Sequence, residues 1–88
     1  KDQCIYNFRE SNSENLRKLF SIYKEEAENL VSKNLTFPAL DFVLKCSHCF
    51  NLLDARGVIS VTDRAQYIEK IRNLAKEVAK SWINKNNS

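Results

Sequence analysis

Glycine and proline are scarce in this chain, with one of each among 88 residues, and methionine is absent. Turn-rich β folds need both residue types at many positions, so their scarcity argues against a β sandwich or barrel. No run of about 18 apolar residues occurs, and we therefore expect no transmembrane helix and no contact with a membrane. The length allows one domain at most.

Charge of one sign is not strongly in excess either. Fourteen Lys and Arg residues stand against eleven Asp and Glu residues, for a formal net charge of +3. The charges are interleaved as on a solvated helix face, although the mild excess also permits contact with nucleic acid. Three cysteines, an odd number, do not suggest the disulfide framework of a secreted protein, and we recognise no signal peptide. We expect a cytoplasmic protein and, because the chain opens at Lys1 without a methionine, a fragment of a longer one.

Apolar residues recur at helical spacing in three stretches. We predict an all-α fold, a small antiparallel bundle of three main helices at about 12–33, 38–54 and 61–84, after an irregular N-terminal segment. The stripe that we expect the third helix to bury consists of Val61, Ala65, Ile68, Ile71, Ala75, Val78, Ala79 and Trp82.

Residues that favour helix ends mark the boundaries of the first and third helices. Ser11 and Glu14 are spaced as a capping pair at the start of the first, and Ser60 and Asp63 at the start of the third. Gly57 is the residue type expected just past the end of the second helix.

The second helix has its own start signal. Pro38 suits a first helical turn, where its missing N–H costs nothing, and Thr36 or Phe37 is then the expected cap. Asn34 tolerates the left-handed conformation that follows the end of the first helix.

The second predicted helix is apolar on two faces. One face carries Leu40, Val43, Leu44, Ser47 and Asn51. The opposite face carries Phe42, Cys46, Cys49 and Leu53. A thin polar stripe of Asp41, Lys45 and His48 runs between them. A bundle helix usually needs a single apolar stripe, so this helix is either central or covered by a partner.

The Cys-x-x-Cys pair at Cys46 and Cys49 raises the question of a metal or redox site. His48 points away from both cysteines on a regular helix, and Cys4 is distant in sequence, whereas structural zinc needs four ligands. Redox pairs sit at helix N-termini, but this pair is in mid-helix. We favour two small buried apolar residues over a metal or redox site.

The helix end that follows contains Asp54 and Arg56, and Arg64 comes shortly after. A fixed corner between two helices explains these residues, and the alternative is a contact with a partner subunit or an RNA phosphate. We identify no catalytic, cofactor-binding or metal-binding residue. The candidate structural, partner or tRNA contacts are His48, Asn51, Asp54, Arg56 and Arg64.

Residues 37–76 resemble the C-terminal part of the alpha subunit of the bacterial two-subunit, class II glycyl-tRNA synthetase. The opening from Tyr6 and the helix after it are also similar to that family, so the resemblance covers nearly the whole chain. The family's Asn-Leu-Leu-Asp-Ala-Arg-Gly motif is found at residues 51–57, and its Ile-Ser-Val-Thr motif at residues 59–62. The family usually carries small residues such as alanine where this chain has Cys46 and Cys49, which favours packing as the role of the thiols.

The resemblance implies a parent enzyme that joins glycine to tRNA(Gly) using ATP and Mg²⁺. It also implies a beta subunit and an α2β2 tetramer. The catalytic core is absent from residues 1–88, so we expect a single helical domain that follows the core, supports assembly and is inactive alone. The alternative is a stand-alone helical module that binds protein or RNA without catalysis.

Overall fold

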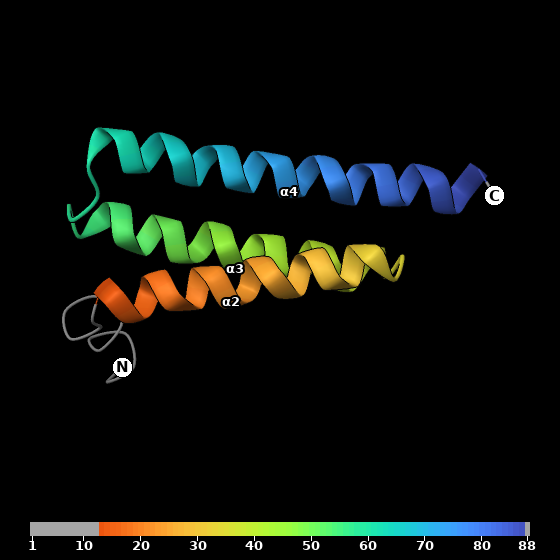
Figure 1. Cartoon of the computed structure of the whole chain (residues 1–88), viewed down its shortest axis with the longest axis horizontal. Coiled ribbons are helices and arrows are strands. Elements are labelled where there is room, and N and C mark those ends of the chain that lie inside the picture. The colour runs from red at the N-terminus through yellow and green to blue at the C-terminus, as the bar shows by residue number, and fades with distance from the viewer. Residues whose placement is uncertain (1–12, 88) are drawn as a thin grey trace.

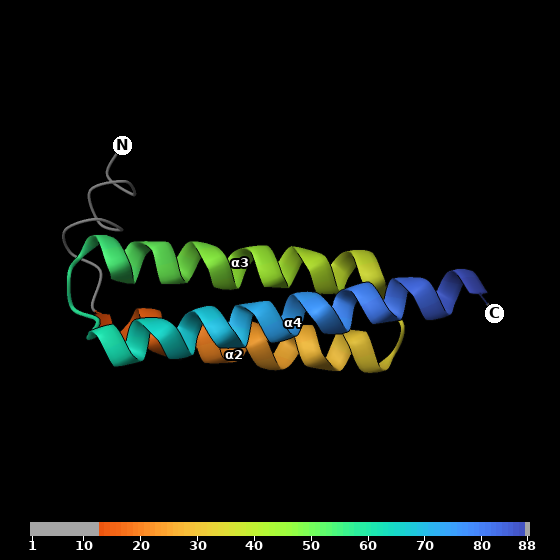
Figure 2. The same cartoon turned by 90° about the horizontal axis from the view of Figure 1, so that it is seen from above.

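The computed structural model describes residues 13–87, the last three by their backbone only. Within this range it contains three helices, α2 (Ser13–Ser32), α3 (Thr36–Ala55) and α4 (Val61–Asn87), and no strand. Successive helices run antiparallel, and α4 extends past the turn that joins α2 to α3 (Figures 1 and 2). No helix of the described part is both long and apolar enough to cross a lipid bilayer. The predicted all-α bundle is confirmed, whereas the predicted irregular segment and the Ser11 cap lie outside the described residues.

A hydrogen-bonded turn ends α2 and leads directly into α3. Asn34 adopts a left-handed backbone with φ 59°. Its N–H donates to the Val31 carbonyl at 2.9 Å, and the Leu35 N–H donates to the Leu30 carbonyl at 2.9 Å. These two bonds form a Schellman motif, which satisfies carbonyls that the end of a helix would otherwise leave unpaired. The predicted role of Asn34 is confirmed.

The start of α3 differs from the prediction, because the helix begins at Thr36 and no side chain caps it. Leu35 occupies the capping position, so the expectation that Thr36 or Phe37 caps the helix is wrong. Only residues 33–35 connect α2 to α3, so the residue that ends this turn, Leu35, is also the one that precedes the helix. Pro38 is the third helical residue, still in the first turn, where its N–H would have no partner. The Thr36 hydroxyl instead lies 3.0 Å from the Ser81 hydroxyl of α4, and both are buried.

The corner between α3 and α4 follows the predicted signals closely. Gly57 has a left-handed φ of 68°, and its N–H donates to the Asp54 carbonyl at 3.0 Å. The Ser60 hydroxyl accepts the Asp63 N–H at 3.0 Å, and the Ser60 carbonyl accepts the Arg64 N–H at 2.9 Å. The glycine relieves the steric cost of a positive φ, and the serine caps α4.

Residues of all three helices meet in one core, and α3 contributes more than half of it. Phe20 of α2 meets Tyr67 of α4 edge to face, with ring centres 4.7 Å apart, and Phe50 of α3 lies 5.9 Å from the same tyrosine ring. Aromatic pairs of this kind add about 0.5–1.5 kcal/mol to the burial of their surface. The buried apolar residues are Leu16, Phe20, Ala27, Ala39, Val43, Cys46, Cys49, Phe50, Leu52, Leu53, Tyr67, Leu74 and Val78.

Only one of the two predicted apolar faces of α3 is covered within the bundle. The face that carries Cys46 and Cys49 is turned into the core, where both residues are buried. On the other face only Val43 is buried, while Leu40 and Leu44 remain 41% and 59% exposed. Although α3 packs against both other helices, its second face stays open to solvent, so the bundle alone does not cover both apolar faces.

The buried stripe of α4 is narrower than predicted and lies about one position away. Tyr67, Leu74 and Val78 are buried, and of these only Val78 belongs to the predicted stripe. Ile68 and Ile71 of that stripe are half-buried. The prediction was wrong at the remaining five positions, which are exposed: Val61, Ala65, Ala75, Ala79 and Trp82. A helix on the outside of a bundle buries only the side that faces its two neighbours, so apolar residues on its flanks stay in water.

Candidate interaction surface

Two of the five predicted contact residues are joined at the corner between α3 and α4. Arg64 Nε donates to Asp54 Oδ1 at 3.3 Å. Both side chains are about half exposed, so this ion pair stabilises the corner by at most about 1 kcal/mol. Arg56 is half-buried at the end of α3, close in sequence. His48 and Asn51 are not part of this cluster; both are exposed, and His48 lines a groove between α2 and α3.

Arg17 of α2 completes the same corner. Its guanidinium donates to Tyr67 Oη at 3.4 Å and to the Val58 carbonyl at 3.3 Å, and it lies 4.0 Å from the Asp63 carboxylate. The sequence analysis missed Arg17, because a single arginine on the polar side of a helix carries no signal of its long-range partners. One side chain thus ties α2 to the connection between the other two helices.

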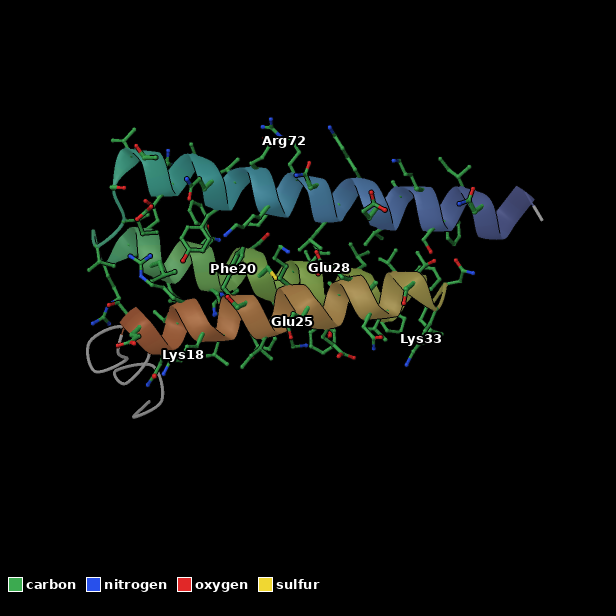
Figure 3. The ribbon with its side chains drawn as sticks, viewed as in Figure 1. Lys18, Phe20, Glu25, Glu28, Lys33 and Arg72 are labelled. Carbon is green, nitrogen blue, oxygen red and sulfur yellow. The ribbon has the colours of Figure 1, made fainter. Side chains whose placement is uncertain are left out.

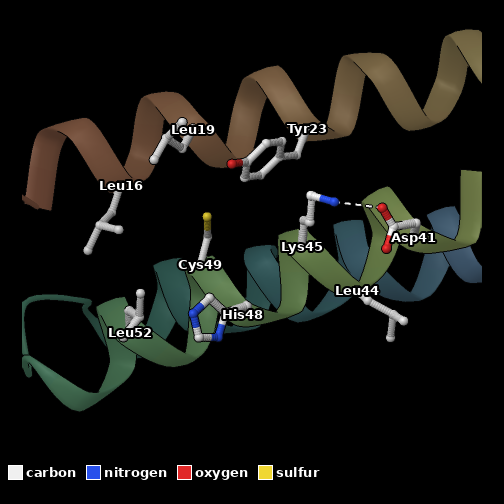
Figure 4. A pocket seen from close by; sticks show the side chains of 9 residues that line it. All are labelled: Leu16, Leu19, Tyr23, Asp41, Leu44, Lys45, His48, Cys49 and Leu52. Atoms are coloured by element: carbon white, nitrogen blue, oxygen red, sulfur yellow. Dashed lines mark hydrogen bonds and ion pairs between the residues drawn. The ribbon is translucent and has the colours of Figure 1, made fainter. Parts of the chain in front are cut away.

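A groove of about 360 Å³ runs between α2 and α3 (Figure 4). Its lining residues come from both helices, and leucines are the most frequent of them. They are Leu16, Leu19, Tyr23, Asp41, Leu44, Lys45, His48, Cys49 and Leu52. We call this feature the α2–α3 groove. It borders the open face of α3, because Leu44 belongs to both.

Charged side chains pair with each other in the α2–α3 groove. Lys45 Nζ donates to Asp41 Oδ2 at 2.6 Å (Figure 4), and the same ammonium lies 4.9 Å from the centre of the Phe42 ring. The ring of His48 and the thiol of Cys49 point in different directions (Figure 4). The predicted polar stripe therefore does line one site, but its histidine and the neighbouring cysteine do not converge on a common point.

The two thiols on α3 are chemically quiet. Burial, reinforced by neighbouring Cys49, raises the pKa of the Cys46 thiol from 9.0 to about 11, and burial also raises the pKa of Cys49. Both thiols are protonated at neutral pH, whereas the thiolate is the reactive form. Cys46 Sγ makes a long contact of 3.8 Å with the Phe20 carbonyl. These properties support packing as the role of the pair.

The side chains that could hold a metal are likewise dispersed. Within residues 13–87, no three His, Cys, Asp or Glu side chains gather into a group that could bind an ion. The acids near the groove and the corner are instead held by basic side chains, as in the Asp41–Lys45 and Asp54–Arg64 pairs. What the arrangement offers is apolar surface, and an apolar groove between two helices is suited to take up the apolar side chains of another helix.

The architecture thus defines a three-helix bundle with an open apolar face. Residues 1–87 match the family model described as glycyl-tRNA synthetase alpha subunit. The chain belongs to the glycyl-tRNA synthetase alpha subunit family. The members of this family are subunits of an aminoacyl-tRNA synthetase.

Proposed function

We propose that this chain is the C-terminal helical domain of the alpha subunit, placed after a class II catalytic core. In this proposal the domain supports assembly with the beta subunit into a cytoplasmic α2β2 tetramer. Through assembly it supports the ATP-dependent attachment of glycine to tRNA(Gly) by the parent enzyme. The observation that carries the proposal is the open apolar face at the α2–α3 groove in a chain that belongs to a family of subunits.

The exposed apolar side chains support a docking role. Leu44 is 59% exposed, and Leu19 on the opposite helix contributes to the same groove. Removing apolar surface from water is favourable by about 25 cal/mol per Å², so a partner that covers these side chains gains affinity from them. Apolar surface gathered at one groove is typical of a protein interface rather than of a free surface.

Within residues 13–87, no group of acidic side chains is gathered to hold Mg²⁺. Magnesium prefers carboxylates that face substrate phosphates, whereas Asp41, Asp54 and Asp63 are each within 4.0 Å of a basic side chain of the chain itself. We propose that the parent enzyme holds ATP and Mg²⁺ elsewhere. The 88 residues alone are then inactive, and glycine-dependent exchange of pyrophosphate into ATP by this chain would contradict that part of the proposal.

Binding of the beta subunit to groove variants tests the assembly role. Leu44→Asn removes an exposed apolar side chain from the groove, and Val61→Asn removes one that is 87% exposed at the start of α4. We expect the first variant to weaken the complex at least tenfold and the second to leave it within twofold. Circular dichroism of both variants is the control for folding, and we expect both to remain helical.

Equal affinity of both variants would contradict docking at the groove. Absence of any complex between the wild-type chain and the beta subunit would contradict the assembly role itself, and it would favour the stand-alone interaction module.

The corner residues give a second test in the parent enzyme. We expect Arg64→Ala to lower stability or assembly more than it alters the KM for glycine, because Arg64 contacts Asp54 within the bundle. We expect the same order of effects for Arg56→Ala at the end of α3. A selective change in the glycine KM, with assembly intact, would contradict the scaffold role.

A further inference from the structure

The positive charge of the three helices is concentrated in α4. Residues 61–87 contain six basic and three acidic side chains. Residues 13–32 contain three basic and four acidic ones, and residues 36–55 contain one basic and two acidic ones. The helix that lies on the outside of the bundle is therefore cationic, while the other two are slightly anionic.

Three of these cations form a row on the exposed side of α4. Arg72, Lys76 and Lys80 are each four residues apart, which places them about 6 Å from one another along the helix axis. All three are exposed, and they lie on the side opposite the buried Leu74 and Val78. Arg72 points away from α2 and α3 (Figure 3). We call this row the α4 ridge.

The ridge is less neutralised than Lys24 of α2 and Lys45 of α3. Lys24 of α2 and Lys45 of α3 are held by carboxylates at 2.8 Å and 2.6 Å. Lys80 is 3.8 Å from the Glu77 carboxylate, and both of these side chains are more than half exposed. Among the described residues, no carboxylate lies within 4.0 Å of Arg72 or Lys76. The ridge thus keeps charge that is available to an external anion.

We propose that the α4 ridge binds the phosphate backbone of RNA. Evenly spaced cations along a straight helix suit a polyanion with regular charge, and such contacts are independent of base sequence. Ala75 and Ala79 are exposed beside the row, and their small side chains allow close approach of a backbone. The choice of RNA over an acidic protein segment rests on the proposed function, since the parent enzyme acts on tRNA.

A pair of charge-matched double variants tests the ridge. Arg72→Gln/Lys76→Gln removes two ridge charges, and Lys18→Gln/Lys33→Gln removes two exposed charges from α2 and the turn after it (Figure 3). The affinity of the chain for a tRNA(Gly) transcript is measured between about 50 and 200 mM salt. We expect the ridge variant to lose about tenfold in affinity at the lowest salt and to reduce the salt slope by about 2. The control variant loses threefold or less.

Glu69→Gln removes a carboxylate from the same side of α4 and should strengthen binding. Equal losses in the two double variants would show that net charge alone acts, and would overturn the proposal. Tighter binding of poly-glutamate than of RNA would also overturn it, in favour of an acidic protein. The Arg72→Gln/Lys76→Gln variant should bind the beta subunit with wild-type affinity. If it does so and also keeps wild-type affinity for the tRNA(Gly) transcript, the proposed role of the ridge is refuted, while the assembly role is unaffected.

Discussion

Leu53→Ala is expected to be the most damaging conservative change within α3. Leu53 is fully buried, with 0% of its surface exposed, in a core built from all three helices. Truncation of a buried leucine to alanine costs about 2–5 kcal/mol, because transfer energy is lost and a cavity remains. A domain of this length has a free energy of unfolding of about 4–13 kcal/mol, so the change removes a large fraction of it.

Urea and thermal unfolding followed by circular dichroism measure this loss. A loss of about 3 kcal/mol lowers the Tm by roughly 12–24 °C in a domain of this size. Leu44→Ala, on the same helix but 59% exposed, is the matched control and should cost less than about 0.5 kcal/mol. A cost below about 1 kcal/mol for Leu53→Ala, or equal costs for the two variants, would refute the placement of the α3 faces.

Three further predictions concern polar and titrating groups. Thr36→Val strands the buried Ser81 hydroxyl and should lower the free energy of unfolding by about 1–3 kcal/mol, which the double change with Ser81→Ala should partly restore; additive urea-unfolding energies would contradict this pairing. Burial raises the pKa of Cys46 from 9.0 to about 11. The contribution of its protonated thiol to the stability of the fold is therefore complete below pH 9 and is lost as the pH rises through about 11. The free energy of unfolding, measured with urea between pH 8 and 11, should therefore fall less steeply with pH for Cys46→Ala than for the wild type. Identical slopes would argue against a buried thiol. A double-mutant cycle on Asp54 and Arg64 should give a coupling below about 1 kcal/mol, since both are about half exposed; a coupling above 2 kcal/mol would contradict that exposure.

The helix ends were largely predictable from sequence because their chemistry is local. Gly57 and Asn34 have positive φ values where a glycine and an asparagine were expected to end helices. Ser60 caps α4 through the Asp63 N–H, as its spacing predicted. The start of α3 was not predictable in this way, since the backbone bonds of Leu35 replace a side-chain cap there.

The burial pattern was less predictable because it depends on how the helices are placed. The predicted stripe of α4 includes both buried Val78 and exposed Val61, and only the position of α4 on the outside of the bundle separates them. Likewise, the sequence shows that α3 is apolar on two faces but not which face the bundle covers.

The candidate site shows the same division between local and long-range information. The polar stripe of Asp41, Lys45 and His48 was recognised by its spacing along one helix. The opposite wall of the α2–α3 groove, with Leu19, depends on packing between two helices. Contacts such as those of Arg17 span more than 40 residues in sequence, and no single helix carries their signal.

The most direct test is methyl NMR of this chain as the beta subunit is added. Methyl groups of leucine and valine are labelled, and the signals of Leu19, Leu44 and Val61 are followed. Docking at the α2–α3 groove predicts that Leu19 and Leu44 shift or broaden while Val61, which does not line the groove, stays unchanged. Shifts confined to Val61, with Leu19 and Leu44 unaffected, would contradict the docking surface.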